Sequence, residues 1–526
     1  MCLRCHALGF FTPKMDRILS NIGDLISGQN EHSAHYAPDE PQSTTSPSLS
    51  EAVVYRYRKQ YGINLGSWFT LERWISEAPF KEVDGQCDLA LAHGPHAKQH
   101  LEAHWDSWLK DEDWDWIRDH GYNTVRIPIG YYHICGLEPS VIHGTDFEPY
   151  RDVYEGAWKR ISRAISTAAS YGIGVLVDLH AAPGAQNKDP HAGTGTGQVH
   201  FWEPHNQSAT VRALRVLAAA LSPIPNVVGL ELLNEPANND SLQGWYEDTI
   251  RAIRSALPPR HADEFPIYVG DAWDPNWYAS WTGQRHDFVV LDHHVYRCFT
   301  PEDLKLTGDQ HAHNIQTDTR GWFTSLSSKA KGNFVIGEWS GALGPSSVGL
   351  PGADAGEQDR QRRVFVRAQS EVFDATSAGS FFWTYKKGQG WDAGWSARDS
   401  RLADILPHWR GGVKRGIGRG KITDNEKQEA LRKAYDSHVA YWEAHGHGSK
   451  EPWRFQDGFS KGWDDAKHFS QNIPASNSSP TIGFLGRWTS RRVADHVQEK
   501  GTSPQLWEFE HGFEQGANAA VAALAD

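Results

Sequence analysis

Eight apolar runs recur along the chain from Tyr61 to Tyr385, and helical spacing appears between them. In Tyr154–Ser170 and Ala209–Leu221, for example, apolar residues return at intervals of three and four, as in amphipathic helices. Buried strands that alternate with helices are typical of a parallel sheet, and eight such units close a barrel. The sequence therefore predicts an α/β protein built on a (β/α)8 TIM barrel. Its strands are expected in Tyr61–Phe69, Tyr122–Gly130, Gly172–His180, Val227–Pro236, Pro266–Trp273, Phe288–Tyr296, Asn333–Ser340 and Gly379–Tyr385.

The segments on either side of this barrel have a different composition. Residues 1–52 are mostly rich in Ser, Thr, Pro and His, so we expect a flexible N-terminal arm. The barrel is assigned to residues 53–412, with a long insertion over 75–111 that can wall one side of a cleft. Residues 413–526 are expected to form a C-terminal helix, over 425–445, and a short aromatic-rich extension packed on the barrel. An independent sugar-binding module is the alternative for this extension.

Charge and cysteine content exclude several classes of protein. The formal net charge of −13 leaves no basic surface for nucleic acid or an anionic membrane, and no apolar run is long enough to span a bilayer. The five cysteines are irregularly spaced, and the Cys2-x-x-Cys5 pair lacks the further ligands of a zinc site. The N-terminus also lacks the apolar core of a signal peptide. We expect a cytoplasmic monomer with free thiols, no metal and no cofactor.

Two of the apolar runs carry a lone glutamate close to their carboxyl end. Glu235 stands in Asn234-Glu235-Pro236, and Glu338 stands in the run Asn333–Ser340. Because the carboxyl ends of barrel strands share one mouth, the two side chains are expected to lie together. Glycoside hydrolysis requires such a pair, one protonated carboxyl for the leaving oxygen and one ionised carboxylate for the anomeric carbon. Taken singly, either residue is more typical of a solvated or ion-paired glutamate.

Six separated motifs occur in order along the predicted barrel. They are Tyr61–Phe69, Val125–Gly130, Asp178–Asn187, Asn234–Pro236, Asp292–Tyr296 and Gly337–Ser340. Over about residues 55–410 this series resembles glycoside hydrolase family 5 of clan A, and within it the fungal exo-β-1,3-glucanase group. Because a signal peptide and paired cysteines are not evident, the chain looks like the intracellular fungal branch of that group.

The resemblance implies roles for the two glutamates and their neighbours. Glu235 would be the acid/base and Glu338 the nucleophile, with Asn234 holding the sugar 2-OH. Arg126 and Tyr296 would stabilise the charge of Glu338. The anion of Glu338 would then raise the pKa of Glu235 and keep that carboxyl protonated as the acid.

The remaining substrate-binding residues implied by the resemblance are aromatic. His180 and His294 would line the donor-sugar subsite, and Trp383 would form its floor. For both histidines, a buried hydrogen-bonded side chain is the alternative. His293 stands next to His294, and the His-x-Tyr spacing of the family selects His294.

The resemblance implies a retaining enzyme that releases glucose from β-1,3-glucans or short β-glucosides, its only partner being that substrate. A glycolipid or steryl β-glucosidase is the alternative within enzymes, since the same family contains them. The alternative from another class is an inactive glucan-binding protein. Its mark in the sequence would have been the loss of Glu235 or Glu338.

Overall fold

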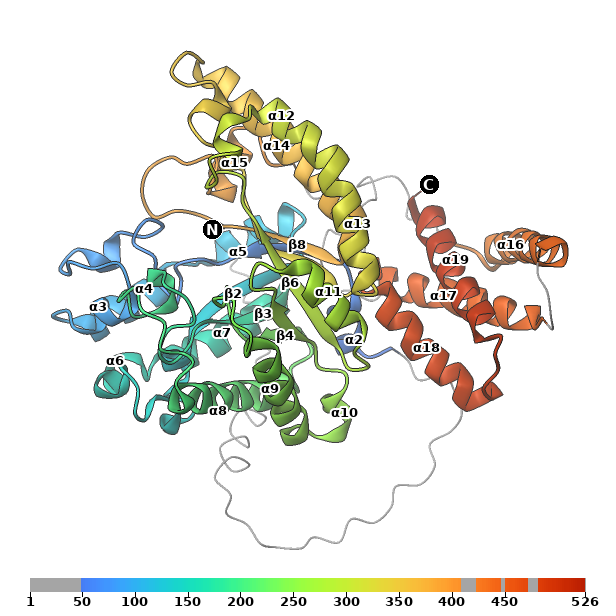
Figure 1. Cartoon of the computed structure of the whole chain (residues 1–526), viewed down its shortest axis with the longest axis horizontal. Helices are drawn as coiled ribbons and strands as arrows, with labels where there is room; N and C mark the ends of the chain where they lie inside the picture. Colours follow the sequence, from blue (N-terminus) through green and yellow to red (C-terminus); the bar gives the residue numbers. More distant parts are fainter. Residues whose placement is uncertain (1–48, 408–421, 446–449, 472–480, 526) are drawn as a thin grey trace, which may run out of the picture.

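The computed structural model describes residues 49–407, 422–445, 450–471 and 481–525. Within them eight parallel strands close a barrel in sequence order, which confirms the predicted TIM fold (Figure 1). The expected arm over residues 1–52 lies almost wholly outside the described residues. The strands are β1 (Gln60–Asn64), β2 (Thr124–Gly130), β3 (Gly174–Ala181), β4 (Val227–Glu231), β5 (Ile267–Gly270), β6 (Val289–Val295), β7 (Phe334–Trp339) and β8 (Gly379–Phe382).

Every strand lies in one of the eight apolar runs, except that β1 begins one residue earlier and β3 ends one residue later. All the strand residues are buried, because helices cover the outside of the barrel and side chains fill its interior. The fourth strand is shorter than expected, since β4 ends at Glu231 and leaves Leu232–Pro236 as a turn above it. Glu235 therefore stands on that turn rather than on the strand.

Amphipathic helices form the outer ring of the barrel. In α7, for example, Trp158, Ile161, Ile165 and Ala168 are buried at intervals of three and four, while Lys159 and Arg163 face solvent. The ring helices are α5 (Asp111–Asp119), α7 (Ala157–Ser170), α8 (Pro204–Leu221), α9 (Leu242–Ala256), α11 (Pro275–Gly283), α13 (Arg320–Lys329) and α14 (Ala355–Thr376).

Shorter helices lie in the loops that connect these elements. The insertion expected over 75–111 carries two of them and stands beside α7 and α6 (Figure 1). The loop helices are α3 (Asp88–Ala92), α4 (Ala97–Ser107), α6 (Arg151–Tyr154), α10 (Pro259–Ala262), α12 (Gly308–Asn314) and α15 (Ala397–Leu402).

A helix that the sequence did not reveal, α2 (Glu51–Tyr57), packs at the amino-terminal end of the barrel. The side chain of Ser50 caps its start, and Val53, Val54 and Tyr57 are buried against strand residues such as Val228. The helix begins at residue 51, so the expected boundary between arm and barrel at 52/53 falls inside it. This end of the barrel is therefore closed.

Four C-terminal helices gather on one side of the molecule, at the right of Figure 1. Phe484, Trp488 and Phe513 pack against the barrel core together with Tyr57, while Trp463 lies in a separate core among the helices themselves. The expected helix over 425–445 corresponds to the first of the four. They are α16 (Asp424–His445), α17 (Pro452–Gln471), α18 (Leu485–Lys500) and α19 (Leu506–Ala525).

Among the described residues, none of the helices combines the length and the apolar character needed to cross a lipid bilayer.

Candidate active site

The eight residues singled out in the sequence come from six strands, or from just beyond their ends, and meet at the carboxyl end of the barrel. All but Glu235 and Tyr296 are buried, and Arg126 and Asn234 have no exposed surface. Parallel strands bring their carboxyl ends to one mouth, which is why residues so far apart in the chain lie together. On the strands themselves stand Arg126 (β2), His180 (β3), His294 (β6) and Glu338 (β7). Just beyond strand ends stand Asn234 and Glu235 (after β4), Tyr296 (after β6) and Trp383 (after β8).

The carboxylate of Glu338 is held from both sides. Arg126 donates from one terminal guanidinium nitrogen to Oε1 over 2.8 Å, and the Tyr296 hydroxyl donates to Oε2 over 2.6 Å. One donor is the guanidinium cation of Arg126 and the other is the phenolic hydroxyl of Tyr296, and both stabilise an ionised carboxylate. Glu338 is therefore fixed in position with its negative charge compensated.

Glu235 sits on a turn that the chain forces into the left-handed region, with φ of 44°. Few non-glycine residues adopt this conformation, and such strain is concentrated at functional sites. Asn187 holds the turn by donating from its side-chain amide to the Glu235 carbonyl over 3.0 Å. The turn directs the carboxyl group to His294, whose Nδ1 lies 2.7 Å from Oε1.

The imidazole of His294 lies between the two glutamates. Its Nδ1 is also 3.5 Å from Oε2 of Glu338, and one oxygen from each carboxylate and this nitrogen all lie within 4.8 Å of one another. The fourth and seventh strands thus bring the carboxylates together, as the strand-end argument predicted.

The charge state of this pair differs from the one expected from sequence. Burial alone would raise the pKa of Glu235, but the hydrogen bond and charge of His294 bring it down to about 2. Burial lowers the pKa of His294, yet the facing carboxylates Glu338, Glu235 and Asp292 together raise it well above its usual value. The proton expected on Glu235 therefore resides on His294 in the free protein. The expectation failed because it considered the anion of Glu338 and left out the imidazole.

Arg126 also organises the residues behind the glutamates. Its guanidinium donates to Oδ1 of Asn234 over 2.8 Å and to Glu231 over 2.7 Å, and it lies 3.1 Å from Asp178. Asp178 in turn accepts, at Oδ2, a 2.6 Å hydrogen bond from Nδ1 of His180. The rigid cation thereby sets the positions of Asn234 and His180.

His180 and Trp383 lie parallel in the same wall of the site. Their rings are stacked with centroids 5.7 Å apart and an angle of 5° between the planes. Nε2 of His180 and the side-chain amide nitrogen of Asn234 are buried without a hydrogen-bond partner in the described residues. Such unpaired polar atoms are costly unless a ligand completes them.

A pocket of about 730 Å³ opens in front of the two carboxylates. Four of the eight expected residues line it, and the other four are buried around it. Aromatic rings dominate the lining, as expected of a surface on which sugar rings stack. The lining residues are Glu72, Arg73, Trp74, Gln86, Asp189, Pro190, His191, Glu235, Trp273, Tyr296, Phe299, Glu338, Trp383 and Trp395.

Sequence reasoning missed two titratable residues of this pocket, Glu72 and His191. Burial raises the pKa of Glu72 to about 7, opposed in part by the charge of His191 and a hydrogen bond from Trp74. Burial lowers the pKa of His191, but Asp189, Glu235 and Glu72 overcome this and raise it to about 9. Both stand in loops several residues beyond the ends of β1 and β3, so neither belongs to an apolar run or a helical repeat that could have identified it in the sequence.

His293, the neighbour that could be confused with His294, points elsewhere. Its Nδ1 lies 2.5 Å from Asp271, and its ring contacts Trp322 and Phe323 in an edge-on arrangement. Alternation along β6 explains this, because successive strand residues face opposite sides.

Acidic and imidazole groups of the site also come close enough to hold a cation. Three such groupings lie in the described residues of the site: Glu235, His294 and Glu338; Asp189, His191 and Glu235; and Glu231, Asp292 and His294. The hydrogen bond between Glu235 and His294 already accounts for their approach.

Two protein-family models match this chain. The model described as Cellulase (glycosyl hydrolase family 5) matches residues 93–387, which include all eight expected residues. The model described as Glucan 1,3-beta-glucosidase 3 C-terminal domain matches residues 423–524, the region of α16–α19.

Similar proteins span nearly the whole chain. Glucan 1,3-beta-glucosidase 3 of Schizosaccharomyces pombe is 32% identical over 485 residues, which cover 88% of this chain and 95% of that protein. An uncharacterized glycosyl hydrolase of Saccharomyces cerevisiae is 29% identical over 504 residues, covering 90% of this chain and 93% of that protein. The crystal structure of rutinosidase from Aspergillus niger superposes with a TM-score of 0.53 at 19% identity, over 66% of this chain and 98% of that one. At this identity the structural likeness bears on the fold alone.

Proposed function

Because this chain belongs to glycosyl hydrolase family 5, we propose that it releases glucose from β-1,3-glucans or short β-glucosides with retention of anomeric configuration. One observation carries the proposal. A carboxylate oxygen of Glu235 and one of Glu338 lie within 4.8 Å of each other, a spacing that suits the roughly 5–5.5 Å between carboxyl groups of retaining enzymes. An inverting pair needs room for a water molecule between carboxylate and sugar, at about 6.5–9.5 Å.

In the first step Glu338 attacks the anomeric carbon and forms a glucosyl ester. Arg126 and Tyr296 hold its carboxylate in line for the attack. The proton on His294 passes along their 2.7 Å hydrogen bond to Glu235, which donates it to the leaving oxygen and ends the step as a carboxylate. The bond from the anomeric carbon to the leaving oxygen breaks, and His294 becomes neutral.

In the second step water attacks the ester from the side that the leaving group vacated. Glu235 takes the proton of the water and passes it to neutral His294, while the bond to Glu338 breaks. Glucose departs and both the proton and the carboxylate charge are restored. The side-chain amide nitrogen of Asn234, which has no hydrogen-bond partner in the described residues, would hold the sugar 2-OH.

The anomer of the first product tests this mechanism. Retention predicts that β-glucose appears first in a proton NMR time course with laminaribiose, before mutarotation. First appearance of α-glucose would contradict it. Binding of the disaccharide without turnover would point to the alternative of a glucan-binding protein.

Release of glucose from chain ends is the second element of the proposal. Gln86 of the insertion that carries α3 and α4, and Trp395 of the loop after β8, both line the pocket, which supports action at one end of a glucan. Laminarin should then yield glucose alone at early times. Internal cleavage of an end-blocked glucan would refute this element.

A glycolipid or steryl glucoside is a second candidate substrate because apolar rings surround the mouth of the pocket. Trp273 and Phe299 are 59% and 67% exposed, a face that an apolar aglycone could cover. A faster rate on a sterol glucoside than on laminaribiose, or binding to liposomes, would favour this candidate.

We also propose that the protein works in the cytoplasm as a monomer. Cys87, Cys135 and Cys298 are free thiols, as is usual in a reducing compartment. Asn206, in a potential glycosylation sequon, is buried and donates to the His200 carbonyl. N-linked glycan on Asn239, which is partly exposed, or a dimer in sedimentation would refute the proposal.

A further inference from the structure

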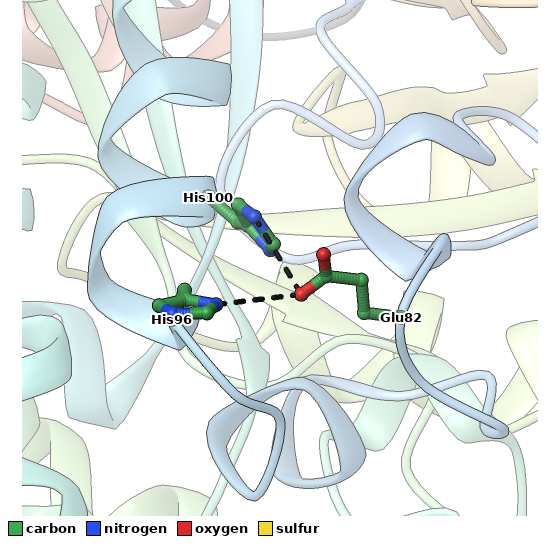
Figure 2. Close-up of side chains that lie close together, drawn as sticks. All are labelled: Glu82, His96 and His100. Carbon is green, nitrogen blue, oxygen red and sulfur yellow. Dashed lines mark ion pairs between the residues drawn. The ribbon is translucent and has the colours of Figure 1, made fainter.

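Two imidazoles and one carboxylate meet on the surface of the insertion that follows β1. Figure 2 shows Glu82 on a loop facing His96 and His100, which stand at the start of α4. Oε2 of Glu82 lies 3.6 Å from Nδ1 of His96 and 3.8 Å from Nε2 of His100. One atom of each residue lies within 4.8 Å of the other two. None of these side chains takes part in the chemistry proposed above.

The spacing fits a small ion better than it fits direct contacts. Both distances exceed the length of a hydrogen bond, so neither imidazole is bonded to the carboxylate. In a tetrahedral site with ligands about 2.0–2.1 Å from the ion, neighbouring ligand atoms are about 3.3–3.4 Å apart. The two distances to Glu82 are a few tenths of an ångström longer. Closing around an ion therefore requires small movements of side chains that are free to turn.

The placement of the two histidines is that of a chelating pair. Residues four apart lie on one face of a helix, so His100 stands one turn beyond His96. His96 precedes the helix with a left-handed φ of 58°, and its ring lies on the side that faces Glu82 (Figure 2). Among the ion pairs of the described residues, Glu82 makes only these two. Its carboxylate is thus uncommitted to any lysine or arginine there.

Charge and ligand type indicate which ion the cluster would take. Two imidazoles and a carboxylate suit zinc and its neighbours in the transition series, whereas calcium and magnesium prefer all-oxygen sites. The start of α4 carries about half a positive charge, which opposes a cation, and the full negative charge of Glu82 outweighs it. We propose that Glu82, His96 and His100 form a binding site for a divalent transition-metal ion such as Zn²⁺, with water completing the coordination.

An ion at this site would brace one wall of the catalytic pocket. The loop that carries Glu82 continues to Gln86, which lines the pocket. Arg73, another lining residue, donates to the carbonyls of Val83 and Gly85 in the same loop. Metal binding would therefore tie this loop to α4 and restrict the motion of the pocket wall. From the sequence we expected no metal site. This cluster escaped notice because Glu82 lies on a different segment from His96 and His100, and no local motif joins the two segments.

The test is a calorimetric titration of the full chain with ZnCl₂ at pH 7.5. We compare the wild type with His96→Gln/His100→Gln and with Glu82→Gln, all of which change exposed or half-exposed side chains. The matched control is His200→Gln/His205→Gln. These two histidines also flank one glutamate, Glu203. There, however, Nδ1 of His200 lies 3.0 Å from Oε1, whereas Nδ1 of His205 lies 3.7 Å from the other oxygen, Oε2. Thermal unfolding of each protein with and without Zn²⁺ supplies a second readout.

The double variant should bind one equivalent of Zn²⁺ fewer than the wild type and the control. Glu82→Gln should weaken the same equivalent at least about tenfold, because the amide removes the charged ligand. All four proteins retain Glu235 and its neighbours, so any Zn²⁺ bound there is common to all of them. The difference in the number of Zn²⁺ equivalents bound by the wild type and by the double variant therefore reports the Glu82 site alone. Zn²⁺ should also raise the melting temperature less in the double variant. Equal stoichiometry and affinity in the wild type and the double variant would overturn the proposal.

Discussion

Nδ1 of His294 lies 2.7 Å from Oε1 of Glu235 and 3.5 Å from Oε2 of Glu338, so one imidazole bridges the two carboxylates. These three groups lie close enough together to share one proton. Because the carboxylates raise the pKa of His294 well above its usual value, this proton stays on the imidazole until substrate binds. In the mechanism proposed above, the general acid is therefore the pair of Glu235 and His294.

Replacing His294 by glutamine should narrow the pH range of activity. In the wild type the required proton sits on a group whose pKa is raised, so activity persists until pH passes that raised value. In His294→Gln the proton must sit on Glu235 itself, whose pKa should rise from about 2 once the imidazole is gone. The alkaline limb of kcat/KM should then move to lower pH, with the maximum reduced about 10²-fold or more.

His293→Gln is the matched control, because that imidazole contacts Asp271 rather than the glutamates. Its alkaline limb should coincide with that of the wild type. An unchanged limb in His294→Gln would show that the bridging imidazole does not hold the catalytic proton.

Glu72 should make folding stability depend on pH near neutrality. Burial raises its pKa to about 7 in the folded protein, against 4.5 for the ordinary carboxyl group. The folded state therefore binds this proton more tightly, and the resulting stability is present below pH 4.5 and lost as pH rises through 7. Because the side chain borders an open pocket, we expect an effect of about 1 kcal/mol.

Thermal unfolding at pH 5 and pH 8 checks this expectation. Glu72→Gln carries no proton that can dissociate, so its melting temperature should fall less between the two values than that of the wild type. Glu112→Gln changes an exposed carboxylate of α5 and should follow the wild type. A fall in Glu72→Gln as large as in the wild type would contradict the shifted pKa.

The barrel and the meeting of Glu235 with Glu338 could be predicted because both depend on local pattern. A buried strand is an apolar run, and the polar residue at its end lies at the barrel mouth whatever the loops do. The turn after β4 was not predictable, since the left-handed φ of Glu235 is imposed by surrounding contacts such as the bond from Asn187. Proton sharing between Glu235 and His294 likewise could not be predicted, because it depends on their separation to within a few tenths of an ångström.

Other misses come from segments that tertiary contacts define. Helix α2 is seven residues long, too short to show a period, and it is held by its buried face against the barrel end. His191 and Glu72 stand in irregular loops, and only closure of the barrel brings them within reach of Glu235. The sequence predicts a C-terminal helix over 425–445 followed by a short aromatic-rich extension, whereas the structure has four helices there. Glycines interrupt the helical pattern of α17 and α19, which hides these helices in the sequence.

Those glycines should be essential for the packing of α17 on α19. A Cβ on Gly462 would lie 2.0 Å from the Phe513 carbonyl oxygen, far inside contact distance. Gly462→Ala should destabilise this helical unit by about 1–3 kcal/mol, despite the better helix propensity of alanine. Urea unfolding followed by tryptophan fluorescence measures the change.

Gly244→Ala provides the matched control within a helix. A Cβ at Gly244 in α9 has no atom within 4 Å, so this variant should gain up to about 1 kcal/mol from helix propensity alone. Equal behaviour of the two variants would show that the close approach of α17 and α19 is not maintained in solution.

The roles of the two glutamates are open to a test by azide rescue with an activated aryl β-glucoside. Glu338→Ala should abolish turnover because no nucleophile remains. Azide should restore some activity by attacking the anomeric carbon directly, on the face that Glu338 occupied, and the product should be the α-glucosyl azide.

Glu235→Ala should behave differently, since an activated leaving group needs little acid assistance. The variant should form the glucosyl ester on Glu338 in a burst and then stall, because no base activates water. Azide needs no base, so it should release the β-glucosyl azide from the ester. On unactivated laminaribiose the same variant should lose about 10²–10⁴-fold in kcat/KM. The wild type in azide is the control and should yield mainly glucose. If the two variants gave the opposite anomers, Glu235 would be the nucleophile and Glu338 the acid, against the geometry in which Arg126 and Tyr296 both hold Glu338.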